Sequence, residues 1–111
     1  MNVPQTIGSD QSTAERKLGI TTIKTSIGEL YTQQHMDSAL VTISETGKIS
    51  HVIRVTSVGS QAETTILFGD RCETNFRLLA REFWRKLGCE VILCLGVRKR
   101  PYPELKRILN L

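Results

Sequence analysis

The sequence predicts one α+β domain, built on a mostly antiparallel β-sheet of about six strands with one long amphipathic helix and a short C-terminal helix. Three observations predict this class. Short β-branched runs separated by glycines fill much of the chain, one segment near residue 80 has helical apolar spacing, and an apolar run precedes the C-terminus. The chain has 111 residues, the size of a single domain, which we expect over residues 19–111. Residues 1–18 are polar, with little apolar surface to bury, and are expected to form a flexible tail.

The first predicted strands are rich in Ile and Thr, which suit a pleated surface. They cover residues 20–27, and after a break at Gly28 residues 29–34 form the second arm of a hairpin. The most regular alternation follows in residues 39–44 and 49–58, which are separated by a turn containing Gly47. Because glycine adopts the left-handed conformation that a short hairpin loop needs, the sequence predicts that these two segments pair as a β-hairpin.

A loop is expected over residues 59–63 and a further short strand over residues 64–68. Asp70 then resembles a helix N-cap, with Glu73 completing a capping box. The helix predicted over residues 71–87 has one apolar stripe and ends at Gly88. Its stripe consists of Phe76, Leu79, Ala80, Phe83 and Leu87.

Residues 91–95 are apolar at every position, which is typical of a strand buried on both faces, and a short helix follows from Pro103. The long helix covers one face of the sheet, and the terminal helix is too short to cover the other. We therefore expect the sheets of two subunits to pair in a dimer. The residues expected at this contact are Val41, Ile43, Ile53 and Val55.

The net charge of +4 is unevenly distributed, since residues 70–111 contain ten Lys and Arg but five Asp and Glu. One basic group repeats along the predicted helix as Arg77, Arg81 and Arg85. A second group follows the last strand, and we take it as the candidate partner-binding site. It consists of Arg98, Lys99, Arg100 and Tyr102. Either group forms an ordinary solvated surface or a docking surface for acidic groups.

The sequence contains no motif for catalysis or for a cofactor. It lacks GxSxG, GxxxxGK[ST] and GxGxxG, and its three cysteines have neither the number nor the spacing of a zinc site. His51 lies on an apolar strand face and is expected to be a hydrogen-bonded packing residue. Trp84 either closes the edge of the core or anchors a partner. We expect no enzyme activity, metal or cofactor.

The expected location is the cytoplasm or the nucleus. Three cysteines are an odd number without a disulfide pattern, which fits a reducing compartment. The longest apolar run, Val91 to Leu95, is far below the ~18 residues that a membrane span needs, so no membrane association is expected.

From residue 20 onward the chain resembles the proteasome assembly chaperone 3 family. The similarity is carried, in the same order, by residues 40–49, the segment 64–69, the helix with Leu79-Ala80-Arg81, the apolar strand 91–97 and the terminal segment 103–106. The resemblance implies a non-enzymatic chaperone that pairs through its sheet with a related small chaperone, assembly chaperone 4. The pair would bind α-type subunits of the 20S proteasome and promote assembly of the α-ring. A homodimer is equally compatible with the sequence.

The alternative function is a small basic nucleic-acid-binding module that uses the two arginine groups. Only six residues are aromatic, and the predicted strands lack the aromatic pair on which RNA-binding sheets stack bases. We therefore rank nucleic acid below an acidic protein partner.

Overall fold

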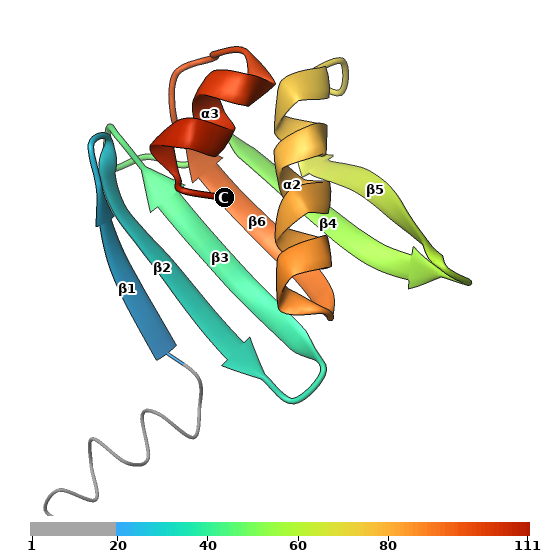
Figure 1. Cartoon of the computed structure of the whole chain (residues 1–111). Coiled ribbons are helices and arrows are strands. Elements are labelled where there is room, and N and C mark those ends of the chain that lie inside the picture. Colours follow the sequence, from blue (N-terminus) through green and yellow to red (C-terminus); the bar gives the residue numbers. More distant parts are fainter. Residues whose placement is uncertain (1–19) are drawn as a thin grey trace, which may run out of the picture.

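The structure is a computed structural model that describes residues 20–111. The tail expected over residues 1–18 lies outside the described residues. A single sheet of six strands has the order β1-β2-β3-β6-β4-β5, and neighbouring strands are antiparallel except for the parallel pair β3 and β6 (Figure 1). The predicted α+β class is confirmed. The elements are β1 (Ile20–Thr25), β2 (Gly28–His35), β3 (Ser38–Ser44), β4 (His51–Val58), β5 (Gln61–Phe68), α2 (Thr74–Leu87), β6 (Glu90–Gly96) and α3 (Tyr102–Ile108).

The hairpin predicted between β3 and β4 is wrong, because β6 lies between these two strands. Leu93 at the middle of β6 is paired with Val41 of β3 on one side and with Ile53 of β4 on the other. The link between β3 and β4 crosses the end of β6, where backbone N–H groups of Glu45 and Ser50 donate to carbonyls of β6 at 2.9 and 2.7 Å. The central position buries the most apolar strand of the chain, which a hairpin would have left at an edge.

The first predicted hairpin is confirmed, since β1 and β2 are antiparallel around a tight turn at residues 26–27. The Thr25 hydroxyl donates to the carbonyl of Gly28 at 2.6 Å and accepts the N–H of Ile27 at 3.2 Å. The loop expected over residues 59–63 is shorter than predicted. Because β5 already begins at Gln61, Gly59 and Ser60 alone form the turn after β4.

The long helix begins later than predicted. Its N-cap is Glu73, without a side-chain capping bond, and the carboxylate of Asp70 instead accepts the N–H of Cys72 at 2.9 Å. The predicted capping box is therefore wrong, because the Glu73 side chain is buried and lies 3.6 Å from the Lys99 ammonium. The predicted terminator is confirmed. Gly88 has a φ of 70° and its N–H donates to the Trp84 carbonyl at 2.9 Å.

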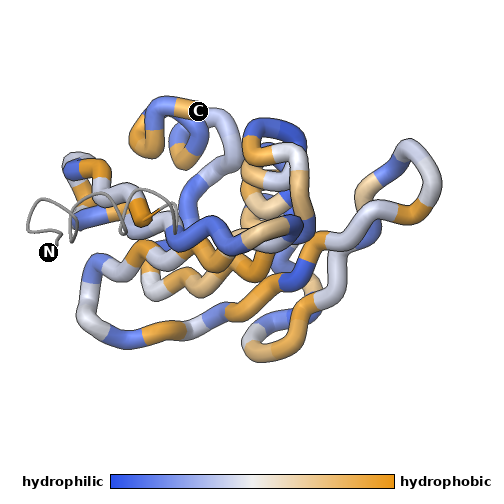
Figure 2. Tube along the Cα trace, turned by 90° about the horizontal axis from the view of Figure 1, so that it is seen from below, coloured by the Kyte–Doolittle hydropathy of each residue, from blue (hydrophilic) through white to orange (hydrophobic). Residues whose placement is uncertain are grey.

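The core lies between the sheet and the two helices, which are on the same side of the sheet (Figures 1 and 2). The predicted helix stripe is confirmed, with Phe76, Leu79, Ala80 and Phe83 buried and Leu87 half-buried. β1 contributes no buried residue, and the other five strands complete the core from the sheet with their buried apolar residues. They are Leu30, Ala39, Val41, Ile43, Ile53, Val55, Ile66, Val91, Leu93 and Leu95. On the opposite side, Ile92 and Cys94 of β6 are only half-buried, so residues 20–111 cover one face of this strand and leave the other partly open.

Candidate interaction surfaces

The four residues expected at the dimer contact belong to the core. Val41, Ile43, Ile53 and Val55 have no exposed surface, because they lie on the face of the sheet that faces α2 and the core. Because these four side chains are fully buried within one chain, the prediction that they contact a second subunit is wrong. A helix of the same chain packs against that face in preference to a second subunit, because packing within one chain does not cost the translational and rotational entropy that association costs. A contact between two sheets would use the opposite face.

We call this opposite side the open face. The strand register places two rows of side chains across it, because directly paired residues point to the same side of a sheet. In one row Leu40 is beside Ile92, and in the other Cys94 is beside Val52, which is beside Phe68. Three of its large side chains are markedly exposed, with Leu40 at 41%, Tyr31 at 46% and Phe68 at 59%. The open face consists of Tyr31, Leu40, Val52, Phe68, Ile92 and Cys94.

Polar groups surround this apolar centre. Arg54 of β4 forms an ion pair of 2.8 Å with Glu90 of β6, and both residues are on the open side. The Tyr31 hydroxyl donates to the carboxylate of Glu29, which raises the pKa of that phenol. An apolar centre within a polar rim is the usual anatomy of a protein–protein interface.

The candidate partner-binding site lies on the connection between β6 and α3, and most of its charge is neutralised. The Arg100 guanidinium holds the Glu45 carboxylate with two hydrogen bonds of 2.9 and 2.8 Å, and both side chains are largely buried. The Arg98 backbone N–H donates to the same carboxylate at 2.7 Å. These bonds, above all those from Arg100, lower the pKa of Glu45 to about 2.

Lys99 and Tyr102 also have acidic partners. The Lys99 ammonium lies 3.2 Å from Asp70 and 3.6 Å from Glu73, and these carboxylates raise its pKa. The Tyr102 hydroxyl donates to Glu82 at 3.1 Å, and burial together with this carboxylate raises the pKa of the phenol. Within residues 20–111, the exposed side chain of Arg98 has no acidic partner. Sequence reasoning missed these pairs because the acidic residues lie far from residue 98 along the chain.

The arginines of α2 have different surroundings. Arg85 is paired with Glu82, whereas Arg77 reaches β5 and donates to the Thr64 hydroxyl at 3.1 Å. Arg81 is exposed. Glu73 and Arg77, like Glu82 and Lys86, are four residues apart, but neither couple is among the ion pairs of residues 20–111, because Lys99 and Arg85 take the two carboxylates.

The histidine and the tryptophan have packing roles. His51 is buried, its Nδ1 lies 3.0 Å from the Ser50 hydroxyl, and its ring packs edge-on against Phe76. The predicted packing role is confirmed, but only one ring nitrogen is hydrogen-bonded, since the buried Nε2 has no partner among the described residues. Trp84 is half-buried against the core and donates its indole N–H to Ser57 at 2.9 Å. Among the described residues there is no group of three or more His, Cys, Asp or Glu side chains placed to hold a metal ion.

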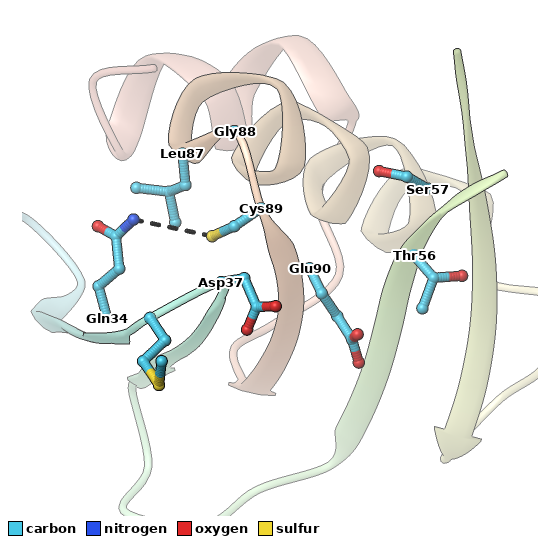
Figure 3. A pocket seen from close by; sticks show the side chains of 9 residues that line it. Gln34, Asp37, Thr56, Ser57, Leu87, Gly88, Cys89 and Glu90 are labelled. Carbon is cyan, nitrogen blue, oxygen red and sulfur yellow. Dashed lines mark hydrogen bonds between the residues drawn. The ribbon is translucent and has the colours of Figure 1, made fainter. Parts of the chain in front are cut away.

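A cavity of about 530 Å³ lies where the β2–β3 turn meets the end of α2 (Figure 3). The Gln34 amide points toward the Cys89 sulfur at 3.8 Å. Burial raises the pKa of the Cys89 thiol, so it is protonated at neutral pH and is a poor nucleophile.

The sequence matches no known family model and no curated protein. In the part of the chain that the structure describes, neither helix has the length and apolar composition that a membrane span requires. Residues 20–111 form a two-layer α+β fold in which neither helix covers the open face of the sheet.

Proposed function

We propose that this protein is a non-enzymatic chaperone of 20S proteasome assembly, which acts as a dimer, binds α-type subunits and promotes formation of the α-ring. The observation that supports it is the open face, whose apolar centre the two helices leave uncovered. The sequence resemblance to the small α-ring assembly chaperones supports the same function.

In this proposal the open faces of two subunits pack against each other. Leu40, Ile92 and Val52 lie on three neighbouring strands, so a second sheet placed at the usual spacing of ~10 Å would cover all three at once. Removing this apolar surface from water supplies the free energy of association. The partner is a related small chaperone, assembly chaperone 4-like, or a second copy of this chain.

For the α-type subunit we propose the surface around Arg98. Its side chain is exposed, and the ion pairs of Lys99 and Arg100 with Asp70 and Glu45 fix the connection from which it projects. The proposed site of action is the cytoplasm or the nucleus. Nucleic-acid binding is the weaker candidate, because three of the six cations in the two basic groups, Arg85, Lys99 and Arg100, already face carboxylates.

The test is capture of the tagged full chain from nuclease-treated lysate at physiological salt, combined with its size in solution. We expect a dimer that retains proteasome α-type subunits. Leu40→Asp places an unpaired charge on the open face and should give a folded monomer that loses them. Ser60→Asp is the matched control, since it adds the same charge at the exposed tip of the β4–β5 hairpin.

Two results would contradict the proposal. One is a wild-type chain that stays monomeric at micromolar concentration and retains no α-type subunit. The other is recovery of nucleic acid in place of proteins when the nuclease is omitted, which would favour the alternative function.

A further inference from the structure

The edge of the sheet formed by β5 lies beside α2 and borders a polar cavity of about 260 Å³. The residues that line it come from β5, from the connection before the helix and from the helix itself. They are Thr64, Thr65, Ile66, Arg71 and Arg77. We call this region the β5 groove. Thr64 and Ile66 are paired with the core residues Val55 and Ile53 on the helix side of the sheet, whereas Thr65 is paired with Arg54 on the open side. The groove therefore follows the strand edge and is centred on the helix side, away from the apolar centre of the open face.

β5 is an edge strand along its whole length of 8 residues. It is paired only with β4, so within the described residues every second N–H and C=O group of β5 faces outward without a strand partner. One of these backbone groups accepts a hydrogen bond from α2: the Arg77 guanidinium donates to the Thr64 carbonyl at 3.4 Å and to the Thr64 hydroxyl at 3.1 Å. Arg77 therefore holds its positive charge directly at the strand edge.

The charge beside this edge is not neutralised by the described residues. Arg71 and Arg77 have no carboxylate within ion-pair distance there, in contrast to Arg54, Arg85, Lys99 and Arg100. The nearby carboxylates of Asp70 and Glu73 are held by Lys99, and Glu63 of β5 is on the open side of the sheet, where it pairs with Thr56.

The other edge of the sheet lacks this combination. The groove between β1 and the helices is lined mainly by apolar side chains, with Lys86 as its one cationic residue. Charge complementarity therefore distinguishes the two edges, and it favours β5 for an acidic partner.

We propose that the β5 groove binds an extended acidic segment of a partner protein, which adds to β5 as a seventh strand. Backbone hydrogen bonds to the free edge would give the affinity, and side chains of the segment would give the specificity. Side chains at every second position of a strand point to the same side. Carboxylates with this spacing would face Arg71 and Arg77 across the groove. This inference does not depend on the proposed chaperone function.

The first test separates strand addition from simple charge attraction. The probe is a fluorescent peptide of the length of β5, in which Glu alternates with Val or Thr, and its anisotropy reports binding to the full chain. Two versions carry N-methyl groups on opposite sets of alternate residues. Because only one set of N–H groups faces β5, we expect one version to bind at least ~10-fold more weakly and the other to bind as well as the parent.

The second test concerns the arginines. Arg71→Gln combined with Arg77→Gln should weaken peptide binding about 10-fold or more, since hydrogen bonds between charged groups are the stronger ones. Arg107→Gln combined with Lys48→Gln is the matched control, because it also removes two charges, both from exposed positions outside the groove. This control variant should bind the peptide with the affinity of the wild type. The N-methyl comparison uses the unmodified protein and is unaffected if the double variant folds poorly.

Four results would overturn the proposal. Equal affinities of the two N-methylated peptides would exclude strand pairing. An oligonucleotide of the same charge that binds as tightly as the peptide would show that the groove binds anions in general. Peptide affinity that falls with rising protein concentration would mean that β5 pairs with a second copy. A double variant, Asp10→Asn with Glu15→Gln, that binds the peptide more tightly than the wild type does would mean that the chain's own N-terminal segment occupies the groove.

Discussion

Glu45 joins two connections that are far apart in the sequence. Its carboxylate accepts hydrogen bonds from the Arg100 guanidinium and from the Arg98 backbone, so the link after β3 is tied to the link before α3. Both side chains are largely buried, where a charge-assisted pair is less screened by water than at the surface. Loss of one partner would leave the other charge poorly solvated.

We predict that Glu45→Gln lowers the free energy of unfolding by about 1–3 kcal/mol at pH 7. The folded-state pKa of about 2 is below the usual value of 4.5. The stabilisation is therefore complete above that usual value and is lost as the pH falls through about 2. Urea denaturation at a series of pH values measures this effect. The difference between wild type and variant should be constant from pH 7 to about 5 and should shrink at lower pH; a difference that persists at pH 2 would contradict the assignment.

At the scale of the elements, β6 organises the sheet. It is paired with β3 and β4 on its two sides, and the link between those strands must pass over its end. The crossing is tight at Gly96, where an added Cβ would lie 1.6 Å from the Lys48 carbonyl oxygen. The absence of a side chain at this position therefore permits the link to cross.

We predict that Gly96→Ala destabilises the protein by about 3 kcal/mol or more, because the backbone of the link would have to move away from β6. The control is Gly47→Ala in the same link. Its added Cβ would have no atom within 4 Å, but its φ of 81° is unfavourable for alanine, so we expect a loss of about 1–2 kcal/mol. Thermal and urea denaturation give both values. Similar losses for the two variants would show that the contact at Gly96 is unimportant.

At the scale of the whole molecule, the described residues form two layers, with one face of the sheet exposed among them. Neighbouring residues of β6 therefore have different roles: Leu93 is fully buried beneath the helices, whereas Ile92 is half-buried on the open face. If the open faces pair, part of the stability belongs to the dimer and depends on protein concentration.

We predict that the urea midpoint of the wild type rises with protein concentration. Leu93→Ala should lower the free energy of unfolding by about 2–5 kcal/mol at every concentration, because it leaves a cavity in the core. Ile92→Ala should mainly reduce the concentration dependence, since its side chain contributes to association. A wild-type midpoint that is independent of concentration would count against pairing of the open faces.

Local patterns in the sequence determined most of the elements. The apolar period of α2, its end at Gly88, the β1–β2 hairpin and the α+β class follow from residues close together in the chain, whose conformational preferences do not depend on distant contacts. The packing role of His51 was likewise visible from its position on an apolar strand face.

The apolar residues of β3 also indicated which face of the sheet is covered, but the prediction assigned that face to a second subunit instead of the helix. On β3, Ala39, Val41 and Ile43 point to one side and only Leu40 to the other among the apolar residues. The richer face was assigned to a partner, although the chain's own amphipathic helix is the first group available to cover it.

Only the tertiary structure decided the strand order, the covered face and the partners of the charged side chains. The insertion of β6 between β3 and β4 maximises burial of a strand that lies more than thirty residues further along the chain, and local alternation carries no information about that choice. The Glu45–Arg100 pair follows from the same insertion, because it brings the end of β6 beside the end of β3. Burial of apolar surface between distant segments, rather than local conformational preference, thus determined which surfaces remain free to bind partners.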